Sequence, residues 1–224
     1  MSPRDGGDFG LIHSPLVGSL TWRGVGKAMG SHPHIPRVRP QDLRAPYAEA
    51  FTQAVSAGTQ SWHTYVVHSA AGFFAHLLPW EANAVIFVDA LLPSPGRSWF
   101  ETAPPPLAAH LAMISDKGWL PPWHTWFGAS TMARLIPDTA LRREFESECP
   151  QIHLSFLQTP TPLGELPHRV GYLQLSDSYA AEADEARARG WLLRTEPMHH
   201  LAMLSDPARL ADIIAEMATE LRAR

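Results

Sequence analysis

The sequence predicts an α/β fold in which a mostly parallel central sheet is flanked by helices and carries one long helical insertion. Short apolar runs of strand length alternate with stretches at helical spacing in the first and last parts of the chain. Strands that alternate with helices in this way form parallel sheets. Between them, closely spaced prolines and many aromatic residues mark a different kind of segment. We therefore expect a core made of residues 1–92 and 168–224 and an insertion over residues 93–167.

The first part of the core contains three apolar runs of strand length and the helical stretches between them. In chain order we expect a strand at 9–13, a helix at 21–29 capped by Thr21, a helix at 46–57, a strand at 64–66, a helix-like stretch at 73–78 and a strand at 84–89.

The insertion is rich in large aromatic side chains, among them Trp99, Trp119, Trp123, Trp126 and Phe127. A solvated linker does not need so many, whereas a lid over an apolar pocket does. We therefore expect a helical lid whose tryptophans line the substrate pocket. The alternative is that these side chains only pack the insertion onto the body.

The alternation resumes after the insertion. In order we expect a strand at 169–175, a helix at 180–189 that ends at Gly190, a strand at 191–194 and a final helix at 206–221. The last helix begins with Asp206 and Pro207, a capping residue followed by proline at the first helical position. A chain of 224 residues with these elements is long enough for one domain and one core.

Composition excludes several function classes. The net charge of −4 offers no basic field for a nucleic-acid backbone. Cys149 is the single cysteine, so neither an internal disulfide nor a cysteine-based metal site can form. No apolar run approaches the ~20 residues that span a bilayer, and the first eight residues do not resemble a secretory signal. We expect a cytoplasmic protein without nucleic-acid or membrane partners.

A serine stands at the corner between a predicted strand and the helix-like stretch, in Val67-His68-Ser69-Ala70-Ala71-Gly72. A serine held at such a corner can be a nucleophile, as in the G-x-S-x-G elbow. Val67 and Ala71 replace the two glycines of that pattern, while Gly72 follows. The alternative is a serine at a turn with no catalytic duty.

Four segments together resemble the α/β-hydrolase superfamily, in particular its small esterase and hydroxynitrile-lyase branch and similar bacterial proteins. The segments are Leu11-Ile12-His13-Ser14-Pro15-Leu16-Val17-Gly18, the Ser69 corner, Phe87-Val88-Asp89-Ala90-Leu91-Leu92-Pro93 and His199-His200-Leu201-Ala202-Met203-Leu204. The resemblance implies the chain order nucleophile, acid, histidine, with Ser69 as nucleophile and His200 as base.

Two assignments have competitors. The family pattern places the base just before the x-x-Met-Leu step, which selects His200 over His199. Asp89 ends a core strand and is the preferred acid, with Asp177 as the alternative because many relatives carry the acid after the next strand. Asp89 could instead only cap a turn. A base and a carboxylate are needed because a serine hydroxyl is a poor nucleophile at neutral pH.

The expected oxyanion hole departs from the family pattern. Its first donor would be the Ala70 amide, and its second falls by alignment on Pro15, which has no N–H. The Leu16 amide or the Ser14 hydroxyl would have to substitute, or only half of the site exists. Losing one donor typically costs ~10²–10³ in rate.

The sequence thus favours a serine hydrolase that acts on a small apolar ester, thioester or lactone. His13 and His68 flank the predicted site and are expected to line its pocket. The runner-up is a lyase, cyclase or isomerase in which Ser69 and His200 act only as acid and base on a bulky apolar intermediate. A binding protein on a hydrolase scaffold is the third hypothesis. We expect neither a cofactor nor a metal, and the sequence leaves the oligomeric state open.

Overall fold

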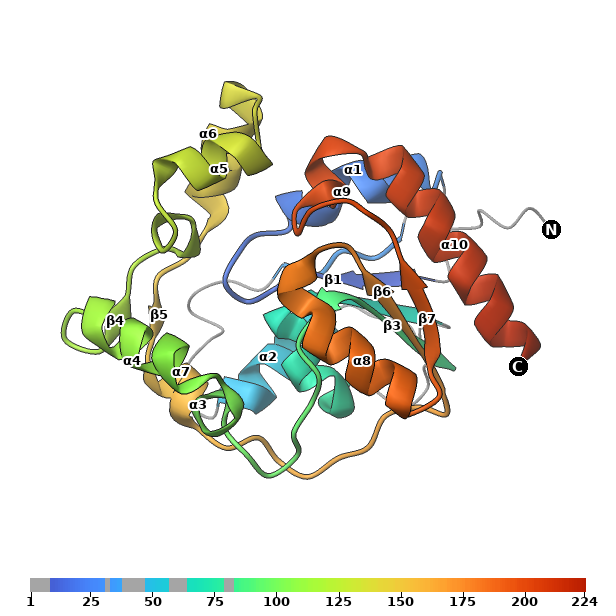
Figure 1. Cartoon of the computed structure of the whole chain (residues 1–224), viewed down its shortest axis with the longest axis horizontal. Helices are drawn as coiled ribbons and strands as arrows, with labels where there is room; N and C mark the ends of the chain where they lie inside the picture. The colour runs from blue at the N-terminus through green and yellow to red at the C-terminus, as the bar shows by residue number, and fades with distance from the viewer. Residues whose placement is uncertain (1–8, 31–32, 38–46, 57–63, 79–82) are drawn as a thin grey trace.

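Five parallel strands form the centre of the molecule (Figure 1). A computed structural model describes residues 9–30, 33–37, 47–56, 64–78 and 83–224. The strands lie in the order β1, β2, β3, β6, β7, and every neighbouring pair is parallel. Their bounds are β1 Phe9–Ile12, β2 Thr64–Ser69, β3 Ala84–Ala90, β6 Arg169–Gln174 and β7 Leu192–Thr195. The expected α/β class with a mostly parallel sheet is confirmed.

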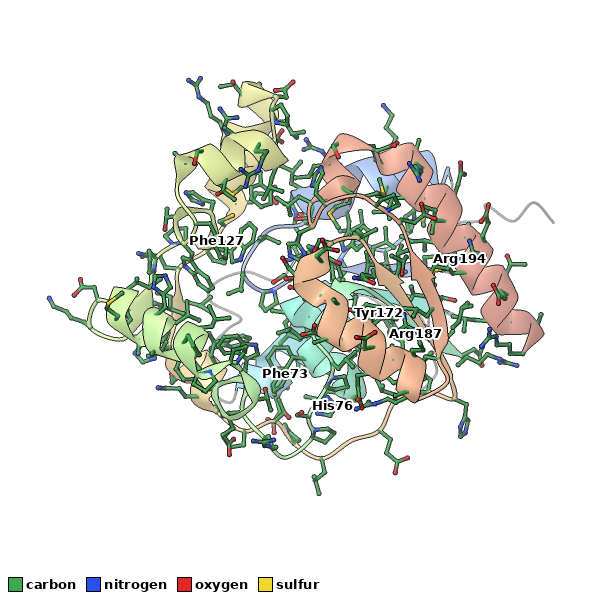
Figure 2. All side chains as sticks on the ribbon, in the orientation of Figure 1. Phe73, His76, Phe127, Tyr172, Arg187 and Arg194 are labelled. Carbon is green, nitrogen blue, oxygen red and sulfur yellow. The ribbon has the colours of Figure 1, made fainter. Side chains whose placement is uncertain are left out.

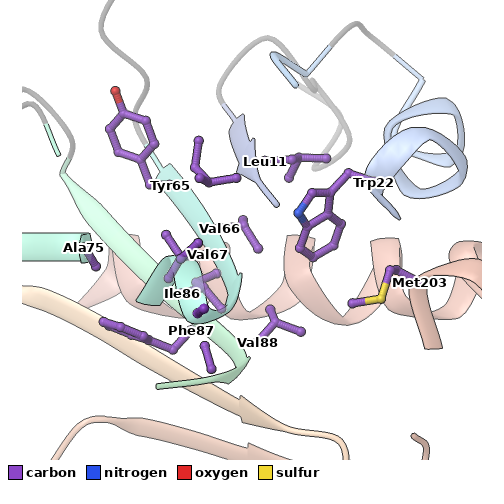
Figure 3. Packing of buried hydrophobic residues seen from close by; sticks show 14 of the residues in the cluster. Leu11, Trp22, Tyr65, Val66, Val67, Ala75, Ile86, Phe87, Val88 and Met203 are labelled. Atoms are coloured by element: carbon purple, nitrogen blue, oxygen red, sulfur yellow. The ribbon is translucent and has the colours of Figure 1, made fainter. Parts of the chain in front are cut away.

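The inner strands are apolar because both faces of the sheet are covered. Every residue of β2 and β3 is buried, as is typical of parallel strands between two helical layers. Val66, Val67, Ile86 and Phe87 pack in this core with no exposed surface (Figure 3). The sheet is therefore a rigid base for the loops that follow its carboxyl ends.

Helices cover the two faces as separate layers (Figure 1). One layer holds α1 Leu20–Ala28, α9 Ala202–Ser205 and α10 Pro207–Ala223, and the other holds α2 Tyr47–Ser56, the 3₁₀ helix η3 Ala70–Leu77 and α8 Ala180–Ala188. Helix α10 begins as expected, because the Asp206 side chain accepts the Arg209 N–H and Pro207 occupies the first turn.

Three local expectations differ from the structure. Thr21 lies inside α1 instead of capping it, and its hydroxyl donates to the Gly18 carbonyl at 2.8 Å. The first N–H of α1 is satisfied from a distant segment, because the Glu148 carboxylate accepts the Leu20 N–H at 2.8 Å. The stretch after Ser69 is a 3₁₀ helix, not an α-helix. Residues 46 and 57 of the expected second helix, and the first eight residues, lie outside the described residues.

The segment that was predicted as an insertion contains short helices and a two-stranded antiparallel ribbon. Its elements are α3 Trp99–Thr102, α4 Pro105–Ile114, β4 Trp119–Leu120, η4 Trp123–Thr125, α5 Ala129–Leu135, α6 Thr139–Glu148, β5 Ile152–His153 and α7 Ser155–Gln158. They lie together on one side of the sheet (Figure 1). Its boundaries at 93 and 167 and its action as a lid remain predictions.

Helix α6 fastens this segment to the core at α1. Glu148 at its end caps α1, and Arg23 of α1 makes two hydrogen bonds to Glu144, at 2.7 and 2.9 Å. Gly18 leaves room for this contact, because a Cβ there would lie 2.1 Å from the Glu148 Oε2 atom. Among the described residues, no helix is both long and apolar enough to cross a bilayer.

Candidate active site

Ser69 ends β2 in a conformation that a serine rarely adopts. Its φ is 55° and its ψ is −129°, and a positive φ outside glycine is a strain that folds retain mainly at functional positions. Asp89 at the end of β3 also has a positive φ, of 43°. Two neighbouring strands thus end in strained polar residues at the same edge of the sheet.

Gly72 is the one glycine of the corner that the fold requires. A Cβ at this position would lie 2.2 Å from the Leu91 carbonyl oxygen and 3.0 Å from the Ala90 Cβ. The turn of η3 therefore passes directly against the end of β3. Ala71 and Val67, which replace the glycines of the elbow pattern, are accommodated in the buried core.

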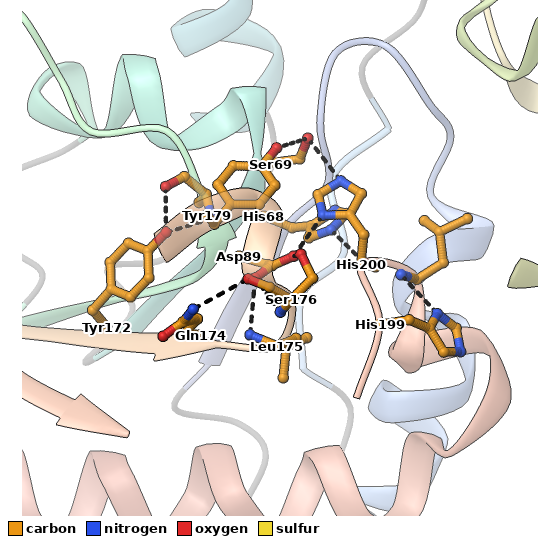
Figure 4. A network of polar contacts seen from close by, with 12 residues as sticks. His68, Ser69, Asp89, Tyr172, Gln174, Leu175, Ser176, Tyr179, His199 and His200 are labelled. Atoms are coloured by element: carbon orange, nitrogen blue, oxygen red, sulfur yellow. Dashed lines mark hydrogen bonds and ion pairs between the residues drawn. The ribbon is translucent and has the colours of Figure 1, made fainter. Parts of the chain in front are cut away.

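The structure brings the hydroxyl of Ser69, the imidazole of His200 and the carboxylate of Asp89 into one chain of contacts (Figure 4). The His200 Nε2 atom lies 3.2 Å from the Ser69 Oγ atom. On the other side of the ring, Nδ1 lies 2.9 Å from the Asp89 Oδ2 atom. An ionised carboxylate only accepts hydrogen bonds, so Nδ1 carries the proton and Nε2 presents its lone pair to Ser69.

The Asp89 carboxylate is fully buried and held by donors from the segment after β6. It accepts the Leu175 N–H at 2.8 Å, the Ser176 N–H at 3.0 Å and the Ser176 hydroxyl at 2.7 Å. These donors and His200 balance the cost of burying its charge. Asp177, the alternative acid, is exposed, and within the described part of the chain it makes no hydrogen bond to His200.

The neighbouring histidine has other partners. His199 Nε2 lies 2.9 Å from the Ser205 Oγ atom, and His199 Nδ1 accepts the Leu201 N–H at 3.2 Å. Burial and the nearby His200 lower the pKa of His199. Of the two candidates for the base, His200 is the one that the structure places on Ser69.

His13 and His68, which we expected to line the pocket, lie beneath the site instead. Both rings are buried, and burial lowers both pKa values, that of His68 far below its usual range. His68 Nε2 lies 3.0 Å from the His200 carbonyl oxygen, to which it donates, and the two rings are 4.5 Å apart. His68 therefore supports the loop that carries His200.

The candidate oxyanion donors are only partly free. Ala70 is the first residue of η3, directly after Ser69, so its N–H is one of the free amides at the helix N-terminus. The Leu16 N–H, however, donates to the Ser14 Oγ atom at 3.2 Å. Of the two substitutes for the missing Pro15 donor, the Leu16 amide is thus bonded to the Ser14 hydroxyl, which still has its own proton to donate.

Comparisons with known proteins agree with this architecture. No protein-family model and no curated protein sequence matches the chain. Solved structures do match: an extracellular α/β-hydrolase from a Paenibacillus species is 14% identical with a TM-score of 0.68, covering 93% of this chain and 98% of that one. The chain has the α/β-hydrolase fold.

Two other similar structures share the fold at low identity. The pyrethroid hydrolase from Sphingobium faniae is 19% identical with a TM-score of 0.68, covering 95% of this chain and 97% of that one. AqDC, whose structure describes recognition and ring-cleavage of the Pseudomonas quinolone signal, is 14% identical with a TM-score of 0.56, covering 94% and 91%. At these identities the likeness establishes the α/β-hydrolase fold and not a substrate.

A cavity of about 990 Å³ opens next to His200 in this α/β-hydrolase fold. Its lining combines an apolar wall with several charged side chains. The apolar wall includes Phe73, Leu91, Leu92, Trp99, Leu107, Trp123 and Phe127, and the charged side chains include Arg134, Asp177, Glu182 and Glu185 (Figure 2 labels Phe73 and Phe127).

Two of the four expected tryptophans are part of this wall, namely Trp99 and Trp123. Trp119 is instead half exposed and packs edge-on against His153. The Trp126 indole N–H donates a hydrogen bond to the Pro121 carbonyl at 2.8 Å, and Trp126 does not line the cavity. Composition shows that a segment is aromatic, but only the path of the backbone decides which rings face the cavity.

Two tyrosines near the site escaped the sequence analysis. The Tyr179 hydroxyl lies 3.3 Å from the Ser69 Oγ atom, and its ring stacks on His200 with 5.0 Å between centroids and 9° between planes (Figure 4). The Tyr172 hydroxyl donates to the Ala90 carbonyl at 2.8 Å and so fixes the backbone after Asp89. The sequence did hold one signal for them: Tyr172 lies in the strand β6 and Tyr179 lies just after it, where the side chains of neighbouring strand ends meet.

The site offers no place for a metal ion among the residues that the structure describes, where no three histidine, cysteine, aspartate or glutamate side chains cluster suitably. The arrangement can move a proton between a hydroxyl and an imidazole whose other nitrogen is fixed by a buried carboxylate. This is the chemistry of nucleophilic attack or of acid–base catalysis.

Proposed function

We propose that the protein is a serine hydrolase that cleaves apolar esters, thioesters or lactones. The observation that carries this proposal is the unbroken series from the Ser69 hydroxyl through His200 to the buried Asp89 carboxylate. The strained backbone of Ser69 and the α/β-hydrolase fold support it. That similar folds include an enzyme described as a pyrethroid hydrolase is consistent with ester substrates.

The reaction would proceed by an acyl-enzyme. Ser69 Oγ attacks the carbonyl carbon, its proton passes to His200 Nε2, and the carbonyl π electrons move to the oxygen. When the adduct collapses, the bond to the alcohol or thiol breaks, and this leaving group takes the proton from His200. Water then repeats the sequence, with His200 as base, and releases the acid. Asp89 keeps the imidazole in the tautomer that accepts from serine.

The cavity supports an apolar acyl or alcohol group in the substrate. Its wall beside the site is built from Phe73, Leu91, Trp99 and Trp123, and burying apolar surface there stabilises a ligand by about 25 cal/mol per Å². A lid formed by the segment 93–167 would complete this wall and exclude water during the reaction. Substrates with long aliphatic or aromatic groups should therefore be preferred to acetyl esters.

Hydrolysis of p-nitrophenyl esters of increasing acyl length tests this proposal. The wild-type protein should hydrolyse the butyrate and octanoate faster than the acetate, and Ser69→Ala should lose this activity. Ser147→Ala, which changes an exposed serine of α6, is the matched control and should retain it. Equal rates in wild type and Ser69→Ala would contradict a serine nucleophile.

One observation favours a second candidate, a lyase, cyclase or isomerase that uses Ser69 and His200 only as acid and base. The Leu16 amide is bonded to Ser14 and Pro15 has no N–H, so a tetrahedral oxyanion receives few backbone donors. In that case Ser69→Ala should retain measurable turnover of a bulky apolar substrate while His200→Ala abolishes it. Complete loss in both variants would favour covalent catalysis.

A further inference from the structure

Among the residues that the structure describes, Tyr179 is the polar side chain outside the Ser69–His200–Asp89 series that contacts the Ser69 Oγ atom. Its hydroxyl lies 3.3 Å from the Ser69 Oγ atom, about as close as the His200 Nε2 atom at 3.2 Å. Its ring lies flat on the His200 imidazole, with 9° between the planes. The phenol therefore contacts the reacting oxygen from a fixed direction.

The direction of this hydrogen bond follows from the rest of the series. Because Asp89 accepts the Nδ1 proton of His200, the Nε2 atom has only a lone pair to offer, and the Ser69 hydroxyl must donate to it. That uses the one proton of Ser69. The contact between Ser69 and Tyr179 can then be made only with the Tyr179 hydroxyl as donor.

We propose that Tyr179 is a catalytic hydrogen-bond donor, which stabilises the negative charge that develops on Ser69 Oγ while the serine proton passes to His200. This inference rests on the proposed serine-hydrolase function. It gives the nucleophile a side-chain donor of its own, beside the donors that the fold directs at the carbonyl oxygen.

The site needs such a donor. Pro15 lacks an N–H, and the Leu16 amide is already bonded to the Ser14 Oγ atom. The Ala70 amide and the Ser14 hydroxyl, which still has a proton to donate, are then the donors left for the carbonyl oxygen. The Tyr179 phenol adds a donor at Ser69 Oγ itself, without any rearrangement of the loop that holds Pro15.

The fold holds this hydroxyl in place and protonated. Tyr179 ends the 3₁₀ turn η5 Asp177–Tyr179, whose preceding residue Ser176 is fixed to Asp89 through both its N–H and its hydroxyl. Burial raises the pKa of the Tyr179 phenol, and the negative charge of Asp89 raises it further. The phenol therefore donates a hydrogen bond and does not transfer its proton, which passes only between Ser69, His200 and the leaving group.

Stopped-flow hydrolysis of p-nitrophenyl butyrate by wild type, Tyr179→Phe and Tyr179→Ala separates the hydroxyl from the ring. Tyr179→Phe keeps the stack on His200 and removes only the donor. We expect it to lower the acylation rate and kcat by roughly 100-fold, the lower end of the cost of one lost oxyanion donor, with KM changed little. Tyr179→Ala should then be only slightly slower than Tyr179→Phe. Tyr65→Phe, which removes another buried phenol outside the site, is the matched control and should retain the wild-type rate.

The outcomes are distinguishable. A fast wild type with an equally fast Tyr179→Phe, and a slow Tyr179→Ala, would show that Tyr179 only stacks on His200 and would overturn the proposed role. A Tyr179→Phe variant with a raised KM and an unchanged kcat would overturn it as well. A wild type no faster than Ser69→Ala would instead overturn the proposed function, and the role of Tyr179 with it. Thermal unfolding of each variant checks that the loss is not one of folding.

Discussion

The carboxylate of Asp89 and the imidazole of His200 meet at 2.9 Å although 111 positions separate them in the chain. Asp89 is completely buried, whereas His200 reaches the cavity. The contact therefore joins the core of the sheet to the space where a substrate would bind. It also fixes which nitrogen of His200 is available to Ser69.

Asp89→Asn should test this contact directly. An asparagine amide can donate to Nδ1, which stabilises the wrong tautomer and places the proton on Nε2. We expect kcat for p-nitrophenyl butyrate to fall about 10⁴-fold, the magnitude found for the equivalent change in a serine protease. Asp177→Asn is the comparison and should lower kcat far less. A larger loss in Asp177→Asn than in Asp89→Asn would reverse the assignment of the acid.

Gly72→Ala should destabilise the fold. The added methyl would lie 2.2 Å from the Leu91 carbonyl oxygen, which belongs to the backbone and cannot move away cheaply. We expect the free energy of unfolding to fall by about 1–3 kcal/mol, as for other overpacked positions, in urea denaturation. Gly26→Ala in α1, whose methyl would meet only the ends of the Pro33 and Ile35 side chains, should change it far less. Equal stability of Gly72→Ala and wild type would refute the close approach.

The stability of the protein should fall as the pH drops below about 6.5, the ordinary pKa of histidine. Burial lowers the pKa of His68 in the folded state, so below that pH the unfolded chain binds a proton that the folded chain does not. Each such histidine contributes a slope of up to about 1.4 kcal/mol per pH unit. Urea denaturation between pH 7.5 and 5.5 measures it.

Two variants identify the source of this slope. His68→Gln removes one titrating ring and should make the slope shallower, although it also lowers stability at pH 7.5; the part that remains comes from the other histidines whose pKa burial lowers, His13, His34, His76 and His199. His168→Gln replaces an exposed histidine and should leave the slope as it is in wild type. A His68→Gln slope equal to that of wild type would assign the dependence to other groups.

Cys149 should not react with iodoacetamide in the folded protein at pH 8. The side chain is buried at the end of α6 and its thiol donates to the Phe145 carbonyl at 3.4 Å. Burial raises its pKa to about 12, so the reactive thiolate is scarce. Intact mass should show labelling in urea and none without it. Rapid labelling of the native protein would place Cys149 at the surface.

The sequence predicted those features that depend on local pattern and chain order. The runs at 64–66 and 84–89 are apolar because β2 and β3 are buried on both faces, and their carboxyl ends carry Ser69 and Asp89. Ser69 and Asp89 can therefore be found from the pattern of apolar strands together with the chain order nucleophile, acid, histidine of the family that the sequence resembles. The low local polarity of a buried strand makes a serine or aspartate at its end conspicuous.

Other features depend on contacts between distant segments and were not predictable in this way. The α1 cap comes from Glu148, which lies 128 positions from Leu20, so a capping rule that examines neighbouring residues selected Thr21 instead. Ser176 and Tyr179 contact Asp89 and Ser69 only because β6 lies beside β3. The orientation of Trp119 away from the cavity likewise follows from its place in the antiparallel ribbon.

Peptide mapping after reaction with a fluorophosphonate tests the central claim most directly, because phosphonylation of a serine requires both an activated hydroxyl and access from the cavity. We predict one adduct per chain, located on Ser69, formed rapidly by wild type and at least 100-fold more slowly by His200→Ala. A folded wild-type protein that carries no adduct, or carries it on a serine other than Ser69, would contradict the account.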